Sequence, residues 1–221
     1  MKTRALLLAL LLGVGLGCGQ NAPSEEAGQQ GEIALPAPVT AGQVSVEEAI
    51  AKRRSVRQFA PQDLTLAQVG QLAWAAQGIT EPNRGLRAAP SAGATYPIEL
   101  YLAKRDGLFR YLPQGHKLVK LSAEDRRADL CGQPSVQQAP LSVVIAAAYE
   151  RTRARYGDRA ERYVVLEAGH VAQNLHLQAV ALGLGSVPVG AFDDQTVAKV
   201  VDLPADQTPL YIIPIGHPAG R

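Results

Sequence analysis

The sequence predicts an α+β fold. Two strand-like runs, at residues 98–103 and 108–112, are joined by Arg105-Asp106-Gly107, and Asp-Gly is a common hairpin turn. The continuous apolar run at residues 141–149 is typical of a central strand. Helical and strand-like segments are interspersed without a regular βαβ repeat, which favours α+β over a doubly wound parallel sheet.

Capping residues set the expected helix boundaries. Ser45 and Thr65 are typical N-cap residues, and they precede helical patterns at residues 46–54 and 66–77. The second pattern is apolar on one face and stops near Gly78. The expected elements that follow are a long helix at 159–182, a short helix at 194–201 and a last strand at 210–215.

Composition limits the classes of function. The chain has 221 residues, of which 47% are hydrophobic and 19% charged, as in an ordinary globular protein of one domain or two. The formal net charge is +2, and two of the positive residues, Lys2 and Arg4, lie at the extreme N-terminus. The rest is balanced in charge, so no electrostatic argument favours nucleic-acid binding.

The N-terminus resembles an export signal. Lys2 and Arg4 precede an apolar run at residues 5–12, which predicts a signal peptide at residues 1–17. Gly17-Cys18 resembles the lipobox of bacterial lipoproteins, in which the cysteine is lipidated, although Gly15 stands where that family usually has Leu. We therefore expect an exported lipoprotein, anchored to the membrane through Cys18 on the periplasmic or cell-surface side.

A tether is expected between this anchor and the folded domain. Residues 18–43 are rich in Pro, Gly, Ala, Gln and Glu and lack an apolar period, which predicts a flexible segment. The domain is then expected to span residues 44–221. Two alternatives stay open: ordinary signal-peptide cleavage with an unmodified Cys18, and a cytoplasmic protein whose N-terminal segment is not a leader.

The first of three chemical segments is basic. Arg53, Arg54, Ser55 and Arg57 place three guanidinium groups and a hydroxyl just past a helix. Guanidinium groups donate paired hydrogen bonds that match phosphate oxygens, so this segment predicts an anion site. The alternative is a solvated basic helix end.

The other two segments suit a flat ligand. Residues 87–97 form a run of small residues that lets the backbone approach a ring, although a tight structural turn is the alternative. Residues 182–194 expose backbone amides around Gly183 and Gly185, after a helix. This order and spacing differ from the strand-to-helix GxGxxG motif, so a dinucleotide fold is not favoured.

Together and in this order, the segments resemble the nitroreductase-like flavoproteins and, among them, the SagB-type, azoline-oxidase-like dehydrogenases. The resembling stretches are RRSVRQF (53–59), APSAGATYPIELYL (89–102), RYGDRAERYVVLEAGHVAQNLHLQAVALGLGSVPVGAFDD (155–194) and PLYIIPIGHPAGR (209–221). The resemblance implies an α+β sandwich, with a mixed or antiparallel sheet flanked by helices. It also implies a homodimer with one FMN in each of two clefts at the subunit interface.

The resemblance further implies which residues bind FMN. The phosphate and ribityl end is implied to contact Arg53, Arg54, Ser55 and Arg57. The isoalloxazine ring is implied to lie against the loop of Pro90, Ser91, Ala92, Gly93 and Ala94. The region near its reactive nitrogen is implied to contact Val189, Gly190 and Ala191. The C-terminal end is implied to return to the phosphate through Gly216, His217 and Arg221.

The implied activity is a two-step hydride transfer through FMN, to or from a small or peptidic substrate, with NAD(P)H as one candidate reductant. The azoline-oxidising branch is expected to use a Lys–Tyr pair, where this sequence has Arg155-Tyr156. Because Arg hardly deprotonates, this departure puts azoline oxidation in doubt and makes Tyr156 the better candidate for the catalytic group.

The sequence leaves a second class of function open. Free NAD(P)H is not expected outside the cytoplasm, and the leader has no twin-Arg signal for export of a folded protein. A catalytically silent flavin- or ligand-binding lipoprotein with the same fold is therefore the alternative. Glu167 and His170 form an E-x-x-H pair, as in half of a di-iron helix, but a second pair is lacking and we expect no metal site.

Overall fold

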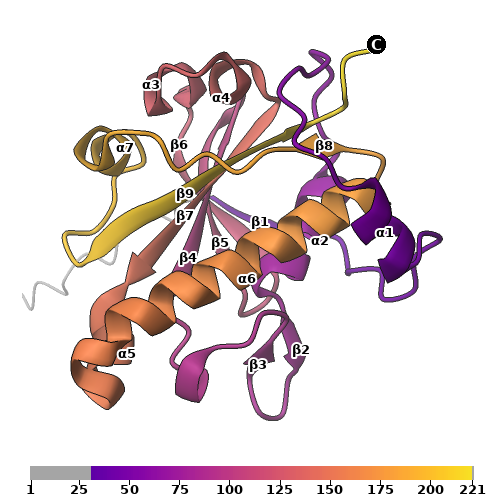
Figure 1. Cartoon of the computed structure of the whole chain (residues 1–221). Helices are drawn as coiled ribbons and strands as arrows, with labels where there is room; N and C mark the ends of the chain where they lie inside the picture. The colour runs from indigo at the N-terminus through magenta and orange to yellow at the C-terminus, as the bar shows by residue number, and fades with distance from the viewer. Residues whose placement is uncertain (1–30, 221) are drawn as a thin grey trace, which may run out of the picture.

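The structure is a computed structural model that describes residues 31–220. Its centre is a seven-stranded antiparallel sheet in the order β1-β6-β5-β4-β7-β9-β8, with a small β2-β3 ribbon beside it (Figure 1). The strands are β1 (Glu32–Ala34), β2 (Ile79–Glu81), β3 (Leu86–Arg87), β4 (Ile98–Lys104), β5 (Gly107–Leu112), β6 (Lys117–Ser122), β7 (Leu141–Ala148), β8 (Gly185–Ser186) and β9 (Gln207–Gly216). The predicted α+β class is confirmed.

Helices cover both faces of the sheet. The helical elements are α1 (Val46–Lys52), α2 (Leu66–Gln77), η1 (Ala92–Ala94), α3 (Arg127–Leu130), α4 (Pro134–Gln138), α5 (Tyr149–Tyr156), η2 (Gly157–Arg159), α6 (Ala160–Ala181) and α7 (Asp194–Val200). The long helix α6 crosses one face together with α2, whereas α3, α4 and α7 lie on the other face (Figure 1). Helix α5 precedes one end of α6, and α1 packs near the other end.

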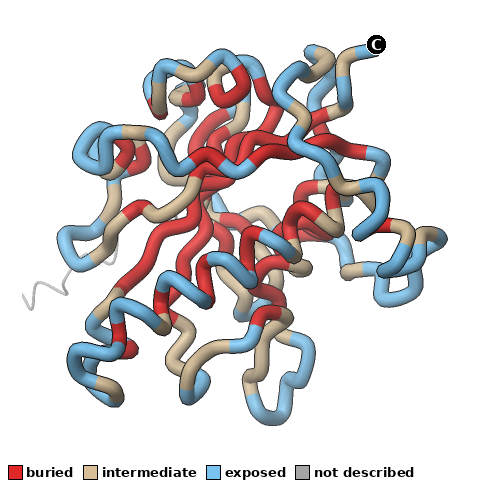
Figure 2. The backbone as a smooth tube through the Cα atoms, in the orientation of Figure 1, coloured by how far each residue is buried: buried red, intermediate tan, exposed pale blue. Residues whose placement is uncertain are grey.

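The alternation of side chains along the strands builds two cores. Ile98, Leu100 and Leu102 of β4 face the α2–α6 side, and Tyr101 and Ala103 face the opposite side. Strand β7 is buried at every position and divides its residues in the same way, which explains its continuous apolar sequence. Figure 2 shows the buried segments concentrated in the central strands and on the inner side of α6.

The cap residues act as the sequence predicts. The Ser45 side chain accepts a hydrogen bond from the Glu48 amide, and Thr65 forms a reciprocal capping box with Gln68. The hairpin at residues 105–107 and the long helix are also confirmed. Strand β6 was not predicted, because its sequence KLVKLS is amphipathic and short.

The predicted tether is wrong for the part of it that the structure describes. Residues 32–34 form β1, which pairs antiparallel with β6, and Leu35 is only 8% exposed within the α2–α6 core. The amide of Leu35 donates to the carbonyl of His116, and the amide of Val39 donates to the side chain of Gln71. The folded domain therefore begins by residue 32 and not at residue 44. The predicted signal peptide and Cys18 lie outside the described residues.

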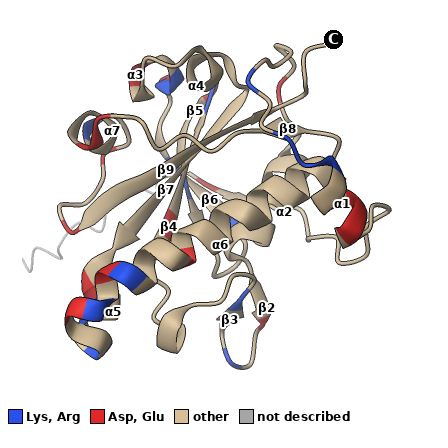
Figure 3. Cartoon of the chain, viewed as in Figure 1, with Lys and Arg blue, Asp and Glu red and all other residues tan. Residues whose placement is uncertain are grey.

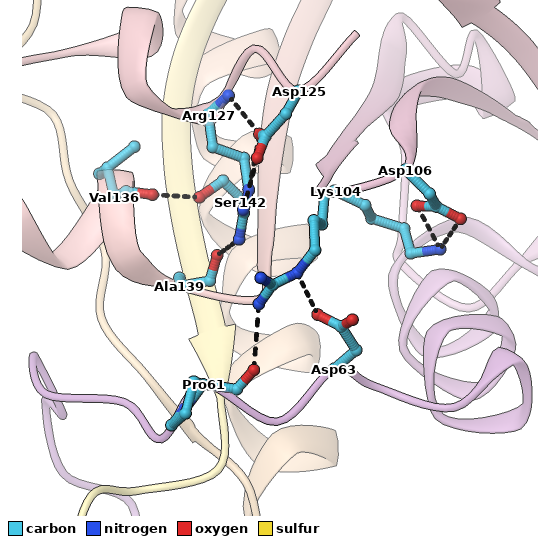
Figure 4. A network of polar contacts seen from close by, with 10 residues as sticks. Pro61, Asp63, Lys104, Asp106, Asp125, Arg127, Val136, Ala139 and Ser142 are labelled. Carbon is cyan, nitrogen blue, oxygen red and sulfur yellow. Dashed lines mark hydrogen bonds and ion pairs between the residues drawn. The ribbon is translucent and has the colours of Figure 1, made fainter. Parts of the chain in front are cut away.

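A buried arginine ties the far-side helices to the sheet (Figure 4). Arg127 is 7% exposed, forms a bidentate ion pair with Asp125 and donates to the carbonyl of Ala139 at 2.7 Å. The hydroxyl of Ser142, on β7, donates to the carbonyl of Val136 at the same place. These bonds satisfy the polar groups that α3 and α4 bury as they pack on β7.

Within residues 31–220, no helix combines the length and the apolar character needed to cross a bilayer.

The packing of the first strand can be tested with Leu35→Ala. This substitution removes a buried side chain from the core and should lower the free energy of unfolding by about 2–3 kcal/mol. Val39→Ala is the matched control, because Val39 is 62% exposed in the same segment, and it should change stability by less than about 0.5 kcal/mol. Urea denaturation of both variants measures the difference. Equal stabilities would mean that the segment does not belong to the core.

Candidate functional site

The basic segment lines a cavity of about 530 Å³, which we call the basic cavity. Arg54, Ser55 and Arg57 line it, with Lys52 beside them. The opposite walls come from residues 180–186, at the end of α6 and in β8, and from residues 218–219. The Lys52 ammonium forms an ion pair with Glu48, and Arg54 donates to the carbonyls of Ala51 and Arg53. Two guanidinium groups and a hydroxyl around one hollow can still hold a phosphate.

Strand β8 fixes the position of the basic segment. The Val56 amide donates to the Ser186 carbonyl at 3.0 Å, and Ser55 and Ser186 form an isolated parallel bridge. Gly185 is required at this contact, because a Cβ there would lie 2.6 Å from the Val56 side chain. The predicted first and third segments therefore lie together.

The C-terminal end returns to the same place, as the resemblance implies. The amide of Ala60 donates to the carbonyl of His217, and the amide of Ala219 donates to the carbonyl of Gln58. Gly216 pairs with Gly185 across the β8–β9 ladder. Arg221 lies outside the described residues.

The predicted turn of Val189, Gly190 and Ala191 continues from β8 along the sheet. Val189 is buried and exchanges two backbone hydrogen bonds with Ile212 of β9. Gly190 and Ala191 are exposed. The buried Val189 therefore holds the turn on the sheet, while Gly190 and Ala191 are exposed to solvent.

A buried histidine contacts a serine in the wall of the basic cavity. His176, on α6, is 4% exposed, and its Nδ1 lies 2.7 Å from the Ser186 hydroxyl. Burial, together with the positive charge of Arg53, lowers the pKa of His176 to about 4. The ring is therefore neutral at pH 7 and adds no charge to the cavity.

Residues 90–96, within the second predicted segment at 87–97, form a strained loop that we call the ring loop. Gly93, Ala94 and Tyr96 all have positive φ, at 60°, 54° and 45°. For residues with a side chain such a conformation costs about 1–3 kcal/mol, and it clusters at functional sites. The Ser91 hydroxyl oxygen accepts the Tyr96 amide at 2.9 Å across the loop.

Helix α5 holds this strained backbone. Arg151 donates to the Tyr96 carbonyl at 3.1 Å, and Arg155 donates to the Gly93 carbonyl at 3.2 Å. The hydroxyl groups of Thr95 and Thr152 lie 2.8 Å apart. Residues 151 and 155 are one helical turn apart, so α5 presents one face to the loop.

The two predicted catalytic residues lie against the ring loop. A Cβ at Gly93 would lie 2.6 Å from the Tyr156 hydroxyl oxygen and 2.9 Å from an Arg155 guanidinium nitrogen. A side chain at position 93 would add strain at this φ and would displace the ends of the Arg155 and Tyr156 side chains, so glycine suits the position. The Arg155–Tyr156 pair and the second segment thus form one local arrangement.

Glu167 is a residue that the sequence analysis discounted. It lies on α6 beneath the ring loop, is 3% exposed, and its Oε1 has no hydrogen-bond partner among residues 31–220. Burial raises the pKa of Glu167 to about 7, and the Ser91 hydroxyl and the Arg87 charge oppose this rise. Its E-x-x-H partner His170 is exposed, so the motif does not bring the two side chains together.

The structure brings the predicted site residues together in two groups and not in one. The basic segment lies beside the C-terminal end of α6, and the charged helix α5 precedes the other end (Figure 3). The ring loop is bonded to α5, through Arg151, Thr152 and Arg155. Glu167, below the ring loop, and Val180, in the wall of the basic cavity, are 13 residues apart on α6, so a rise of about 1.5 Å per residue separates the groups by about 20 Å. One chain therefore presents two half-sites.

A larger groove, of about 680 Å³, lies between residues 37–46, α2 and α6. None of the predicted site residues lines it. Its walls are mostly apolar, and the polar exceptions on α2 and α6 are Gln68, Gln71, Asn174 and Gln178. We place the candidate chemistry in the two half-sites, which gather the cationic and strained groups.

The buried carboxyl of Glu167 makes stability depend on pH. Its pKa is about 7 in the folded chain against an ordinary 4.5, so the folded state holds the proton more tightly. The stabilisation is complete below pH 4.5 and is lost as the pH rises to about 7, by about 3 kcal/mol. Glu167→Gln cannot titrate, so its stability relative to wild type should increase by about 2.5 kcal/mol between pH 5 and pH 8.

Urea denaturation at several pH values measures this difference. His176 titrates in the opposite sense over a lower range, and comparison of variant with wild type cancels its contribution. Glu161→Gln is the matched control, since Glu161 is an exposed residue of the same helix. A stability difference for Glu167→Gln that does not vary with pH would contradict the assigned pKa.

Known proteins resemble this chain over most of its length. A model of the nitroreductase family matches residues 50–217. A protein of Methanocaldococcus jannaschii that is named as a candidate nitroreductase is 40% identical over 196 residues, which are 84% of this chain and 96% of that protein. The FMN reductase [NAD(P)H] of Bacillus subtilis is 32% identical over 104 residues, 41% of this chain and 42% of that protein.

The fold agrees with this match. A crystal structure of a candidate nitroreductase from Ralstonia eutropha superposes with a TM-score of 0.80 at 33% identity, covering 86% of this chain and 90% of that one. The family model begins inside α1 and ends at His217, so it includes the basic segment, the ring loop and the helix between them. This chain therefore belongs to the nitroreductase family.

Proposed function

We propose that the chain is an FMN-dependent oxidoreductase, which transfers hydride in two steps to or from a small or peptidic substrate. Membership of the nitroreductase family supports this proposal, as does the similarity to a protein named FMN reductase. The observation that carries it is the basic cavity, whose guanidinium groups suit the phosphate of FMN. NAD(P)H is one candidate reductant.

The residues present fit this cofactor. A Cβ at Gly185 or Gly93 would collide with neighbouring side chains, so both half-sites keep their backbone open by using glycine. Arg54, Ser55 and Arg57 would hold the phosphate end, and the ring loop would face the isoalloxazine ring. The flavin would supply the hydride chemistry, and the protein would supply orientation and electrostatics.

We propose further that each complete site forms between two copies of the chain. The separation of the half-sites along α6, about 20 Å, supports this, because a flavin mononucleotide is shorter than that distance. A homodimer can place the ring loop of one copy beside the basic cavity of the other. The outer face of α6 suits such an interface, since it exposes two apolar residues and a glycine one turn apart. These residues are Val165, Leu166 and Gly169.

The roles of Arg155 and Tyr156 follow from their position. Tyr156 places a hydroxyl beside the ring loop, where it can donate or accept a substrate proton. Arg155 places a permanent positive charge there and holds the Gly93 carbonyl. Since Arg replaces the Lys expected of the azoline-oxidising branch, we place the chain beside that SagB-type branch and propose a different substrate chemistry for it.

We also propose export and membrane anchoring through Cys18, on the basis of the N-terminal sequence. The electron donor would then be a membrane-bound or extracytoplasmic reductant instead of free NAD(P)H. A full chain found with Met1 and its first residues intact in the cytoplasm would contradict this part of the proposal.

The proposed function predicts a visible flavin spectrum. The full chain, purified and incubated with FMN, should retain the yellow cofactor through gel filtration and should elute as a dimer. Anaerobic addition of NADH or NADPH, or of dithionite as a chemical reductant, should bleach it. Retained flavin that dithionite alone reduces would indicate another donor or a catalytically silent binding protein, and loss of flavin would contradict the proposal.

The anion half-site predicts a specific loss of affinity. Arg57→Ala should weaken FMN binding by about 1.5–3 kcal/mol, the value of a hydrogen bond to a charged group. Fluorescence titration measures the dissociation constant. Arg84→Ala is the matched control, since Arg84 is exposed in the β2–β3 turn, away from both half-sites, and its loss should leave FMN affinity unchanged.

Riboflavin, which lacks the phosphate, distinguishes the role of Arg57 from a general defect. Its affinity should be equal in wild type and Arg57→Ala. An equal loss of affinity for riboflavin and FMN would place Arg57 elsewhere than at the phosphate.

A further inference from the structure

Glu99 is a buried acidic residue of β4 that belongs to neither half-site. It is 8% exposed, and each of its carboxylate oxygens lies against a different arginine. Oε2 accepts hydrogen bonds from Nε and Nη2 of Arg110, at 3.2 Å and 3.0 Å, and Oε1 lies 2.6 Å from Nη1 of Arg151. Two cations make the burial of the carboxylate tolerable. Glu99 therefore joins β5, through Arg110, to α5, through Arg151.

Arg151 connects this carboxylate to the ring loop. Its Nη1, the same atom that faces Glu99, also donates to the Tyr96 carbonyl at 3.1 Å. A guanidinium Nη carries two hydrogens, so one nitrogen can serve both acceptors. The carboxylate, the guanidinium and the carbonyl therefore form a continuous path from the sheet to the loop.

Tyr96 is a residue of the ring loop that needs such support, since its φ is 45°. Its amide donates to the Ser91 hydroxyl oxygen, which belongs to the loop itself. Its hydroxyl accepts the Arg87 amide at 3.0 Å, and the Arg87 guanidinium lies 4.5 Å from the centre of its ring. Arg87 comes from the short strand β3, outside the seven-stranded sheet. Among these bonds, only the one from Arg151 leads to the central sheet, through Glu99.

The carboxylate is needed because the Arg151 side chain is 40% exposed and can otherwise turn towards water. Fixing an arginine costs more rotamer freedom than one hydrogen bond to a neutral carbonyl returns. A bond between two charged groups is about twice as strong as a neutral one. Glu99 is itself held by β4 and by Arg110. It therefore supplies the fixed charge that keeps the guanidinium against the loop.

The other arginine at the loop lacks this support. Arg155 donates to the Gly93 carbonyl at 3.2 Å, and among residues 31–220 it forms no ion pair. It can turn away from the loop at the cost of one hydrogen bond to a neutral group. Arg151 can do so only by also leaving Glu99, and it is therefore the firmer of the two anchors.

We propose that Glu99 is a positioning residue, which fixes Arg151 and thereby holds Tyr96 and the ring loop in their strained conformation. The inference rests on the proposed function only for the identity of the ligand that the loop faces, FMN. Arg110 provides a matched control for it. Arg110 is bonded to the same carboxylate, and its side-chain hydrogen bonds within residues 31–220 go to Glu99 alone.

Hydrogen exchange of the Tyr96 amide in the full chain, without cofactor, tests the positioning directly. Glu99→Gln and Arg151→Gln should each lower the protection of this amide about tenfold, as when one hydrogen bond is lost. Arg110→Gln should lower it less than about twofold. The amides that pair β4 with β7 should keep their protection in all three variants, which shows that the change is confined to the loop.

Double variants test whether Glu99 acts through Arg151. Glu99→Gln should add nothing further in the Arg151→Gln background and should keep its full effect in the Arg110→Gln background. The second double variant also serves if Glu99→Gln alone does not fold, because it removes one of the two arginines left facing a neutral side chain. Effects of Glu99→Gln and Arg151→Gln that add in full would overturn the proposal. An unchanged Tyr96 amide, or loss of protection throughout β4, would also overturn it.

Flavin titration provides the second measurement. Glu99→Gln should weaken the binding of FMN and of riboflavin by the same factor, about fivefold, because the ring loop would face the ring that they share. Arg110→Gln should leave both affinities unchanged. A loss confined to FMN, or no loss, would contradict a role at the ring. If wild type binds neither flavin, the proposed function fails, and the exchange experiment still decides whether Glu99 positions the loop.

Discussion

The packing of α6 across the sheet is the constraint on which both half-sites depend. This helix buries a carboxyl near its start and an imidazole nine residues later, and each group lies against a serine of a different half-site. Glu167 lies under Ser91 of the ring loop, and His176 lies under Ser186 beside the basic segment. A helix is stiff over this distance, so the two serines are held at a fixed separation by one element. A shift of α6 would disturb both half-sites at once.

The apolar cores on the two faces of the sheet offset the energetic cost of this arrangement. Burying two titratable side chains opposes folding, as does a loop with positive φ at Ala94 and Tyr96. The two apolar cores on either side of β4 and β7 supply the opposing stabilisation. The strain is also confined, because hydrogen bonds from α5 and from Ser91 hold the strained residues. Local strain at a site within a well-packed fold is the usual way in which a protein keeps a reactive geometry.

Sequence patterns predicted those parts of the molecule that are determined locally. The caps at Ser45 and Thr65, the Asp-Gly hairpin and the apolar strand β7 follow from neighbouring residues, and all are present. The first strand was missed because EIA is too short and too polar at its ends to signal pairing, and its partner lies more than 80 residues away. The position of Glu167 beneath the ring loop was missed because that loop is distant from it in the sequence. The E-x-x-H spacing drew attention to a local metal pair instead.

The two half-sites are held by different kinds of contact, which suggests that they have different roles. The basic cavity is braced by backbone pairing from β8 and from residues 217–219, so it can hold an anion without rearrangement. The ring loop is held instead by side chains, namely those of α5 and the Ser91 hydroxyl. In the proposed flavoprotein, the phosphate would therefore be bound constantly, and the environment of the ring and its exchanging substrates would be the adjustable part.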